Sequence, residues 1–174
     1  WAGHGNDIAS AMAEMEDLEQ TIKMLTSYVD QHPDTLVVLT ADHSTGGLTI
    51  GADGDYRWSP EYIQNMKASV MAIAEKMPAQ EDMALYVEDM FGFELNTEEK
   101  NIISGITSDT KIKERNTILK SILDKRTNTG WTTSGHTGVD VEVYAFGAGA
   151  QVFAGNLNNT DIAEKIFEFL GEVK

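Results

Sequence analysis

The stretch Leu36-Val37-Val38-Leu39-Thr40-Ala41-Asp42-His43 runs from four apolar residues directly into two residues of types that bind metals. Consecutive apolar residues without polar alternation predict a parallel strand that is covered on both faces. Open α/β sheets bind their ligands at the carboxyl ends of strands, which is where Asp42 and His43 lie. A second interpretation is a strand-end turn, in which the aspartate caps the following backbone and the histidine is merely exposed.

The segments around this stretch alternate between helix and strand patterns. Apolar residues between 8 and 29 recur at steps of three and four, which predicts a helix with one face on a core and with Asn6 or Asp7 as its N-cap. After Gly46 and Gly47, the chain resumes an extended course over residues 48–50. A further strand covers residues 141–146, and a final helix begins near Asn159 with its apolar residues turned inward. This alternation predicts an α/β fold.

Residues 56–128 carry helix signals and no strand signal. Ser59-Pro60-Glu61 is typical of a helix start, and the apolar stripe that follows continues to Met77. Three further helices are predicted, one that ends at Gly92, one from residue 96 or 97 to about 105, and one from residue 108 to 126. The segment is therefore predicted to be a helical insertion, and its simplest role is packing or forming an interface without chemistry.

The composition limits the possible partners and metal ligands. The chain has 174 residues with 28 acidic and 13 basic side chains, for a net charge of −15. Such a surface repels nucleic-acid phosphates and anionic lipids, so we expect no nucleic-acid and no membrane partner. Because the chain has no cysteine, a metal would be held by oxygen and imidazole ligands. The chain begins with Trp1, within what looks like a structural unit, and we expect a fragment.

Three histidines occur in settings that suit a metal site. His4 lies between two glycines, His43 follows Asp42 at the end of the predicted strand, and His136 lies in the segment Ser134-Gly135-His136-Thr137-Gly138. Imidazole and carboxylate ligands suit zinc, and a catalytic zinc site keeps one position open for water or substrate. Each histidine taken alone is more often an ordinary loop residue, and it is their recurrence at the ends of core elements that makes a shared site an equal alternative.

Three segments together resemble the C-terminal metal-binding signatures of the alkaline phosphatase family, in the family's order. They are Trp1-Ala2-Gly3-His4-Gly5-Asn6-Asp7, Thr40-Ala41-Asp42-His43-Ser44-Thr45-Gly46-Gly47 and Ser134-Gly135-His136-Thr137-Gly138-Val139-Asp140-Val141. The resemblance covers residues 1–51 and 131–174, and residues 56–128 occupy the place of the family's variable crown. It implies that residues 1–174 are the C-terminal portion of one alkaline phosphatase domain. The implied fold is an α/β/α sandwich with a mainly parallel sheet and a crown-like helical insertion at 56–128.

The resemblance also implies a function and a set of metal ligands. His4 and His136 would bind one zinc ion, and Asp42 and His43 would bind a second. The implied reaction is the hydrolysis of phosphate monoesters to inorganic phosphate through a phosphoserine intermediate. Two cations about 4 Å apart can clamp the attacking and the leaving oxygen of a phosphoryl group, which agrees with that reaction. A magnesium site would lie mostly outside this chain.

Other parts of the family pattern are absent from this sequence. The nucleophilic serine belongs to an N-terminal half, and no serine here matches its motif, so no catalytic residue is assigned and we expect the chain alone to be inactive. The family further implies a homodimer, a periplasmic or extracellular location, and the N-terminal half as a partner. The alternatives are a related phosphodiesterase, sulfatase or phosphomutase, or a non-catalytic metal-binding or dimerisation module.

Overall fold

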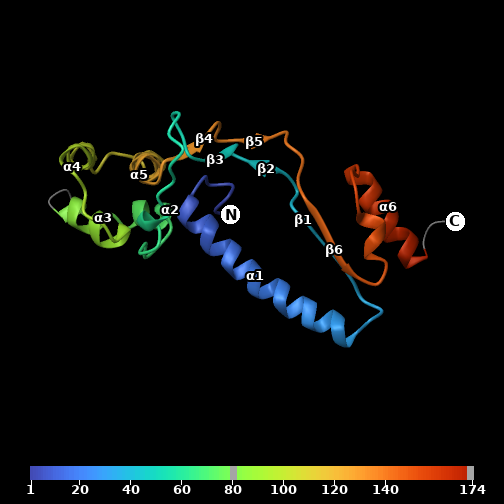
Figure 1. Ribbon diagram of the computed structural model, residues 1–174. Coiled ribbons are helices and arrows are strands. Elements are labelled where there is room, and N and C mark those ends of the chain that lie inside the picture. Colours follow the sequence, from blue (N-terminus) through green and yellow to red (C-terminus); the bar gives the residue numbers. More distant parts are fainter. Residues whose placement is uncertain (79–81, 172–174) are drawn as a thin grey trace. The chain divides into compact units, whose positions relative to one another are not determined.

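The structure is a computed structural model that describes residues 1–78 and 82–171. It contains both helices and strands (Figure 1), which is consistent with the predicted α/β class, but the strands come in two groups of three with a run of helices between them. The chain divides into two compact units. Unit 1 contains Trp1–Met15 and Thr45–Thr137, and unit 2 contains Glu16–Ser44 and Gly138–Lys174. In the described residues, no helix is long and apolar enough to cross a membrane.

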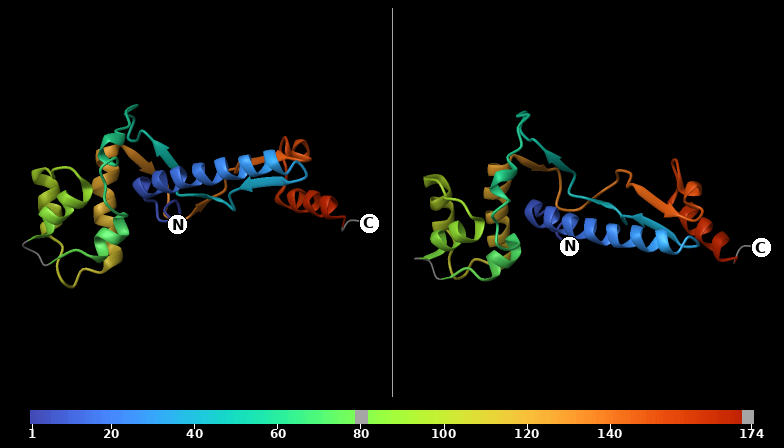
Figure 2. Two further views of the ribbon diagram at one scale, coloured as in Figure 1. Left: turned by 90° about the horizontal axis from the view of Figure 1, so that it is seen from below. Right: turned by 60° about the horizontal axis from the view of Figure 1, so that its bottom comes forward.

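Unit 1 holds the main hydrophobic core, between four helices that lie against one another in Figure 2. These helices are α2 (Val70–Glu75), α3 (Met83–Phe91), α4 (Thr97–Ser104) and α5 (Ile112–Thr127). Val70, Ile73, Val87, Phe91 and Leu119 are completely buried there. Complete burial of each large apolar side chain contributes about 1.5–3 kcal/mol, so this core is what holds the helical segment together.

The ends of α3 and α4 lie where local signals predict them. α3 ends at Gly92, whose φ of +74° favours glycine. A Cβ at Gly92 would also lie 2.6 Å from the Cβ of Asn65, so a larger residue would displace its neighbour. α4 begins with a capping box, in which the Asn96 side chain accepts from the Glu99 amide and the Glu99 carboxylate accepts from the Asn96 amide.

The predicted long helix from Ser59 to Met77 is wrong. Only residues Pro60–Tyr62 form a short 3₁₀ turn, η1, and α2 starts after Ser69. The backbone between them is bonded to distant groups instead, because the Lys67 amide donates to the Met90 carbonyl at 2.9 Å. Likewise, α5 begins at Ile112 and not near residue 108. Tertiary hydrogen bonds override the apolar stripe here.

Strand β1 (Leu36–Thr40) corrects the prediction of a parallel, fully covered strand. It pairs antiparallel with β6 (Val143–Gly147), with Leu36 opposite Gly147 and Thr40 opposite Val143. The two strands run side by side in Figure 1. Residues Leu36–Leu39 are half-buried. An apolar run indicates that burial of both faces of a strand is favourable. It does not determine whether the strand pairs parallel or antiparallel, because the partner strand is far away in the sequence.

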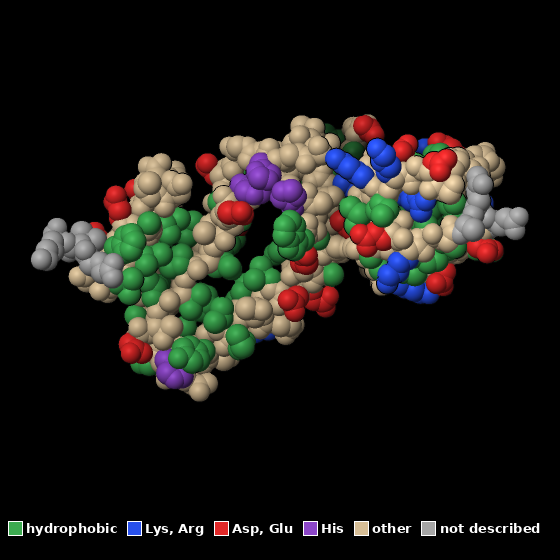
Figure 3. All heavy atoms as spheres, turned by 180° about the vertical axis from the view of Figure 1, so that it is seen from behind, with side chains coloured by type: hydrophobic (Ala, Val, Ile, Leu, Met, Phe, Trp, Pro, Cys, Tyr) green, Lys and Arg blue, Asp and Glu red, His purple; other side chains and the backbone are tan. Residues whose placement is uncertain are grey.

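Two helices in the chain expose apolar residues that we predicted to be inward. Met15 of α1 (Ile8–Gln31) is 59% exposed, and Leu170 of α6 (Asn159–Leu170) is 65% exposed. Within the described part of unit 2, Phe153 is the one apolar residue that is fully buried. Figure 3 shows hydrophobic side chains at the surface over β6 and α6. The helices have the predicted apolar stripes, but in this chain little packs against them.

Short strands lie next to the histidine-bearing segments. β3 (Leu48–Ile50) pairs antiparallel with β4 (Thr129–Trp131), and β2 (Ser44–Thr45) pairs with β5 (His136–Thr137). The extended course predicted for residues 48–50 is confirmed. In unit 1, these ladders join the glycine turn at residues 46–47 to the segment that carries His136.

Candidate metal centre

The loop that carries His4 is a compact turn anchored on two helices. Hydrogen bonds within it run from the Gly5 amide to the Trp1 carbonyl at 3.0 Å and from the Asp7 amide to the Ala2 carbonyl at 3.1 Å. Asp7 caps α1, as predicted, because its Oδ1 accepts from the Ser10 amide at 3.0 Å. Its Oδ2 accepts from the Val70 amide of α2 at 2.8 Å. The buried Asp7 carboxylate therefore ties the loop to the starts of α1 and α2.

The segment that carries His136 is held against the glycine turn. The Gly46 amide donates to the Gly135 carbonyl at 2.9 Å, and the Thr132 amide donates to the Gly46 carbonyl at 2.8 Å. Gly46 has a φ of +73°, and a Cβ there would lie 2.5 Å from the Trp131 ring and 2.6 Å from Asn6 Oδ1. A side chain at position 46 would therefore separate segments that must approach closely.

Asn6 links the two histidine segments directly. Its Nδ2 donates to the Thr133 carbonyl at 2.8 Å, which ties the His4 loop to the chain just before His136. As a result, the structure brings together His4 and His136, which are 132 residues apart in the sequence.

The two imidazole rings have a separation that suits a shared zinc ion. His4 Nε2 and His136 Nε2 are 3.3 Å apart, and the ring planes meet at 79°. Two nitrogens that bind one tetrahedral zinc at 2.0–2.1 Å lie about 3.3–3.4 Å from each other, by the geometry of the tetrahedron. The distance between the two nitrogens therefore matches that of two ligands of one zinc ion.

Asp42 and His43 form a second pair, at the end of β1. Asp42 Oδ1 accepts from the His43 amide at 3.1 Å, and Asp42 Oδ2 lies 3.4 Å from His43 Nε2. The Nδ1 atom of His43 is 3.3 Å from the Ser44 carbonyl. A histidine that binds zinc through Nε2 commonly donates its Nδ1 proton to a carbonyl, and the position of the Ser44 carbonyl suits that role. The oxygen–nitrogen separation again matches about 3.4 Å for two ligands of one ion.

Each pair supplies fewer ligands than a zinc ion needs. A zinc ion takes about four ligands. Among residues 1–78 and 82–171, no three histidine or carboxylate side chains converge in a way that could hold a metal by themselves. The assignment of His4, Asp42, His43 and His136 as ligands stays a prediction that the pair geometry supports.

Sequence reasoning missed the residues that support the His4 loop and Trp131. Lys120 Nζ of α5 donates to the Gly5 carbonyl at 2.7 Å, and Trp131 Nε1 donates to Asp124 Oδ1 at 3.1 Å. On α1, the Glu14 carboxylate accepts from the Ala2 amide at 3.0 Å. No local pattern could have identified Lys120, because its acceptor lies 115 residues away. Burial raises the pKa of Asp124 from its ordinary value of 3.8 to about 6.

We expect Asp124→Asn to stabilise the chain at neutral pH and to have little effect near pH 4. Between pH 3.8 and about 6, the folded state keeps the Asp124 proton that the unfolded state loses, so stability falls as the pH rises. Asparagine does not ionise, and its side-chain oxygen still accepts from Trp131. The free energy of unfolding of the variant should therefore exceed that of the original chain by up to about 3 kcal/mol above pH 6. Thermal unfolding of both chains at pH 4 and pH 8 measures it. An equal difference in stability between the two chains at both pH values would contradict the raised pKa of Asp124.

With this geometry established, comparison with known proteins places the chain in a family. The sequence profile of the alkaline phosphatase family matches residues 1–172, so the chain belongs to that family. This match confirms the resemblance to the family that the three signature segments indicated. Alkaline phosphatase 3 of Bacillus subtilis is 41% identical over 174 residues, a match that covers 98% of this chain and 37% of the relative. Alkaline phosphatase 4 of the same organism is 37% identical with the same coverage.

Solved structures agree with the family and with the α/β class. A cold-active alkaline phosphatase from a psychrophilic Shewanella species superposes with a TM-score of 0.85 at 44% identity, over 100% of this chain and 43% of that chain. The alkaline phosphatase of Thermus thermophilus superposes with a TM-score of 0.78 at 22% identity, covering 99% of this chain and 41% of that one, which supports the fold alone. The chain thus spans little more than a third of the length of the Bacillus relatives it matches.

Proposed function

We propose that this sequence contributes half of the metal ligands of a zinc-dependent enzyme that hydrolyses phosphate monoesters. In this proposal, His4 and His136 bind one zinc ion, and Asp42 and His43 bind a second. The observation that carries it is the 3.3 Å separation of His4 Nε2 and His136 Nε2, in a chain of the alkaline phosphatase family. Two bound zinc ions would supply positive charge to the attacking and leaving oxygens of the phosphoryl group.

The residues of this chain hold and orient the ligand atoms. The Ser44 carbonyl, 3.3 Å from His43 Nδ1, would accept the Nδ1 proton when Nε2 binds zinc. The His43 amide holds one oxygen of Asp42 and turns the other toward His43 Nε2. Asn6 and Asp7 hold the His4 loop on Thr133 and on the starts of α1 and α2. Fixed ligands lower the cost of ordering the site when the metal binds.

The remaining ligands and the nucleophile are proposed to come from further polypeptide of the same protein. Two observations support this part of the proposal. The chain matches only 37% of the length of its Bacillus relatives, and no three ligand side chains converge within its described residues. The exposed apolar faces of α1 and α6 also suit contacts with further polypeptide, because such faces favour burial. We further propose a magnesium site in that polypeptide and a homodimeric, exported enzyme.

The activity is tested with a complete polypeptide that carries this sequence. We expect hydrolysis of p-nitrophenyl phosphate that stops after zinc is removed by a chelator and returns when zinc is added. Bis(p-nitrophenyl) phosphate and p-nitrophenyl sulfate are the matched substrates for the related phosphodiesterase and sulfatase activities. Faster turnover of either one, or zinc binding without any hydrolysis, would contradict the proposal and favour the alternatives.

The 174-residue chain by itself is expected to release no phosphate from p-nitrophenyl phosphate. Two ligands for each zinc leave both ions incompletely coordinated, and no serine in the chain matches the nucleophile. The measurement is a zinc-supplemented assay of the homogeneous chain beside the complete polypeptide at equal concentration. Sustained, zinc-dependent turnover by the isolated chain would show that the site is complete without further polypeptide.

A further inference from the structure

One face of helix α5 contacts the His4 loop and the strand β4 that leads to the His136 segment. Lys120 and Asp124 are four residues apart, so their side chains leave the same side of the helix. Lys120 Nζ donates to the carbonyl of Gly5, the residue that follows His4, at 2.7 Å. Asp124 Oδ1 accepts at 3.1 Å from Nε1 of Trp131, on the strand that precedes the His136 segment. The contact with Gly5 joins residues that are 115 positions apart, whereas Trp131 lies only seven residues after Asp124.

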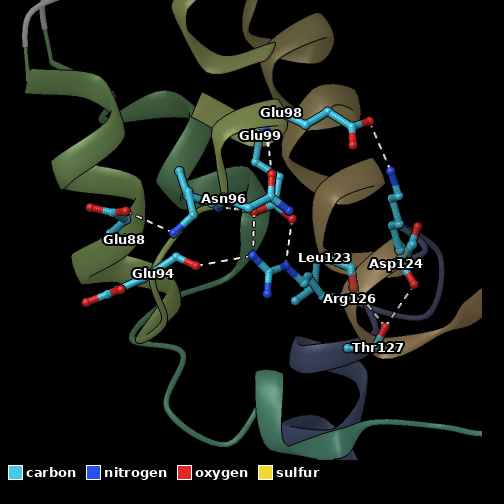
Figure 4. Close-up of polar contacts among 11 residues, drawn as sticks. Glu88, Glu94, Asn96, Glu98, Glu99, Leu123, Asp124, Arg126 and Thr127 are labelled. Atoms are coloured by element: carbon cyan, nitrogen blue, oxygen red, sulfur yellow. Dashed lines mark hydrogen bonds and ion pairs between the residues drawn. The ribbon is translucent and has the colours of Figure 1, made fainter. Parts of the chain in front are cut away.

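Other residues of α5 hold the helix in the core. Leu119, Ile122 and Leu123 are almost completely buried in the hydrophobic cluster of unit 1. At the end of the helix, Arg126 binds the carboxylate of Glu99 on α4 through two hydrogen bonds (Figure 4). A helix held in this way is a rigid platform for its other side chains.

Lys120 and Trp131 each make further contacts with the residues around them. Lys120 is half-buried, and this burial lowers the pKa of its ammonium group, although the carboxylates of Asp124 and Asp7 oppose the shift. The Trp131 ring packs against the core and lies so close to Gly46 that a Cβ there would be 2.5 Å from it. The Gly46 backbone in turn bonds with Gly135, next to His136. A short chain of contacts therefore leads from each of the two α5 residues to one histidine.

We propose that α5 is a brace for the zinc site, in which Lys120 and Asp124 are positioning residues for His4 and His136. This inference rests on the proposed function and adds a role for the helical segment 56–128 beyond packing. By holding the Gly5 carbonyl and the Trp131 ring on one rigid helix, the two side chains keep the histidine Nε2 atoms at the separation that one zinc ion requires.

The test compares Lys120→Met with Lys125→Met in a complete polypeptide that carries this sequence. Lys125 lies on the same helix, but its ammonium binds Glu98 at the surface, so it is a control for loss of a positive charge. We expect Lys120→Met to weaken zinc binding about 10-fold, within the range seen for groups that support a metal ligand, and Lys125→Met to leave it unchanged. The zinc dissociation constant is measured by competition with a chelator, without an activity assay.

Three further variants separate positioning from general stability. Lys120→Arg keeps a charged donor toward the Gly5 carbonyl and is expected to restore most of the zinc affinity. Asp124→Leu removes the acceptor of Trp131 and is expected to weaken zinc binding, whereas Asp124→Asn keeps the acceptor and the affinity. Cobalt absorption spectra of the substituted enzyme report the ligand geometry directly, and they should change in Lys120→Met and Asp124→Leu only.

The results distinguish the brace from the proposed function. If the unsubstituted polypeptide binds no zinc, the proposed function fails and the brace fails with it. If it binds zinc and Lys120→Met has the same dissociation constant and cobalt spectrum as Lys125→Met, the brace alone is overturned. A loss of zinc affinity in Lys120→Met that Lys120→Arg does not restore, with an equal loss in melting temperature for both variants, would also reject positioning.

Discussion

Replacing His136 with alanine in a complete polypeptide that carries this sequence is expected to weaken zinc binding by more than about 100-fold and to lower phosphatase activity strongly. Loss of a group that merely supports a ligand costs about 10–100-fold, and a lost ligand costs more because the ion is left under-coordinated. Zinc content by mass spectrometry under native conditions and hydrolysis of p-nitrophenyl phosphate measure the two effects.

The matched control for this prediction is His32→Ala. His32 lies just after α1, exposed, with its ring stacked on Tyr28 at 3.9 Å between centroids. The same change of side chain there should leave zinc content and rate unchanged. Full zinc occupancy and an unchanged rate in the His136 variant would remove that residue from the proposed metal site. An equal loss in both variants would show that the effect comes from general destabilisation.

The second large effect is expected at Arg126, where Arg126→Met should destabilise the chain by about 3–5 kcal/mol. The Arg126 guanidinium binds both Glu99 oxygens at 2.6 Å, and the Glu99 side chain is 5% exposed. Its charge also lies 5.3 Å from the ring centres of Tyr62 and Phe93. Without the guanidinium, the buried Glu99 carboxylate keeps its charge but loses its partner.

Lys125→Met is the control for Arg126→Met, because the neighbouring pair Lys125–Glu98 is at the surface. Its side chains are 70% and 66% exposed, and such pairs contribute about 0–1 kcal/mol. We expect the double variant Glu99→Met/Arg126→Met to lose less stability than Arg126→Met, since it leaves no buried charge. Urea unfolding at pH 7 compares the variants. Similar losses for Arg126→Met and Lys125→Met would contradict the buried-pair account.

The Glu99 pair should also make the chain more sensitive to acid. Burial raises the pKa of Glu99, but the hydrogen bonds from Arg126 and from the Asn96 amide outweigh it, so the pKa is lowered overall. A carboxyl with a lowered pKa in the folded state contributes stability above its ordinary pKa, and this contribution is lost as the pH falls through the folded value. Asp124, whose pKa is raised, acts in the opposite direction.

Local signals in the sequence predicted the ends of elements well, because the residues that make them are neighbours. Asp7 caps α1, Gly92 ends α3 and Asn96 starts α4, and each acts on backbone groups within four residues. The pattern also placed Asp42 and His43 at a strand end. These predictions needed no knowledge of the tertiary structure.

Contacts between distant segments were beyond the same reasoning. The antiparallel pairing of β1 with β6 and the bond from Lys120 to Gly5 join residues that are more than a hundred positions apart. The break before Val70 has the same origin, because the amide of Val70 donates to Asp7. Apolar stripes identified α1 and α6, but how far a stripe is buried depends on what packs against it, which the stripe does not contain.

The most direct test of the account is a crystal structure of a complete polypeptide that carries this sequence, with anomalous diffraction data at the zinc edge. The account predicts two zinc peaks. One should lie about 2.0–2.1 Å from both His4 Nε2 and His136 Nε2, and the other should be bound by Asp42 and His43. A zinc peak away from these residues, or His4 and His136 bound to different ions, would contradict it.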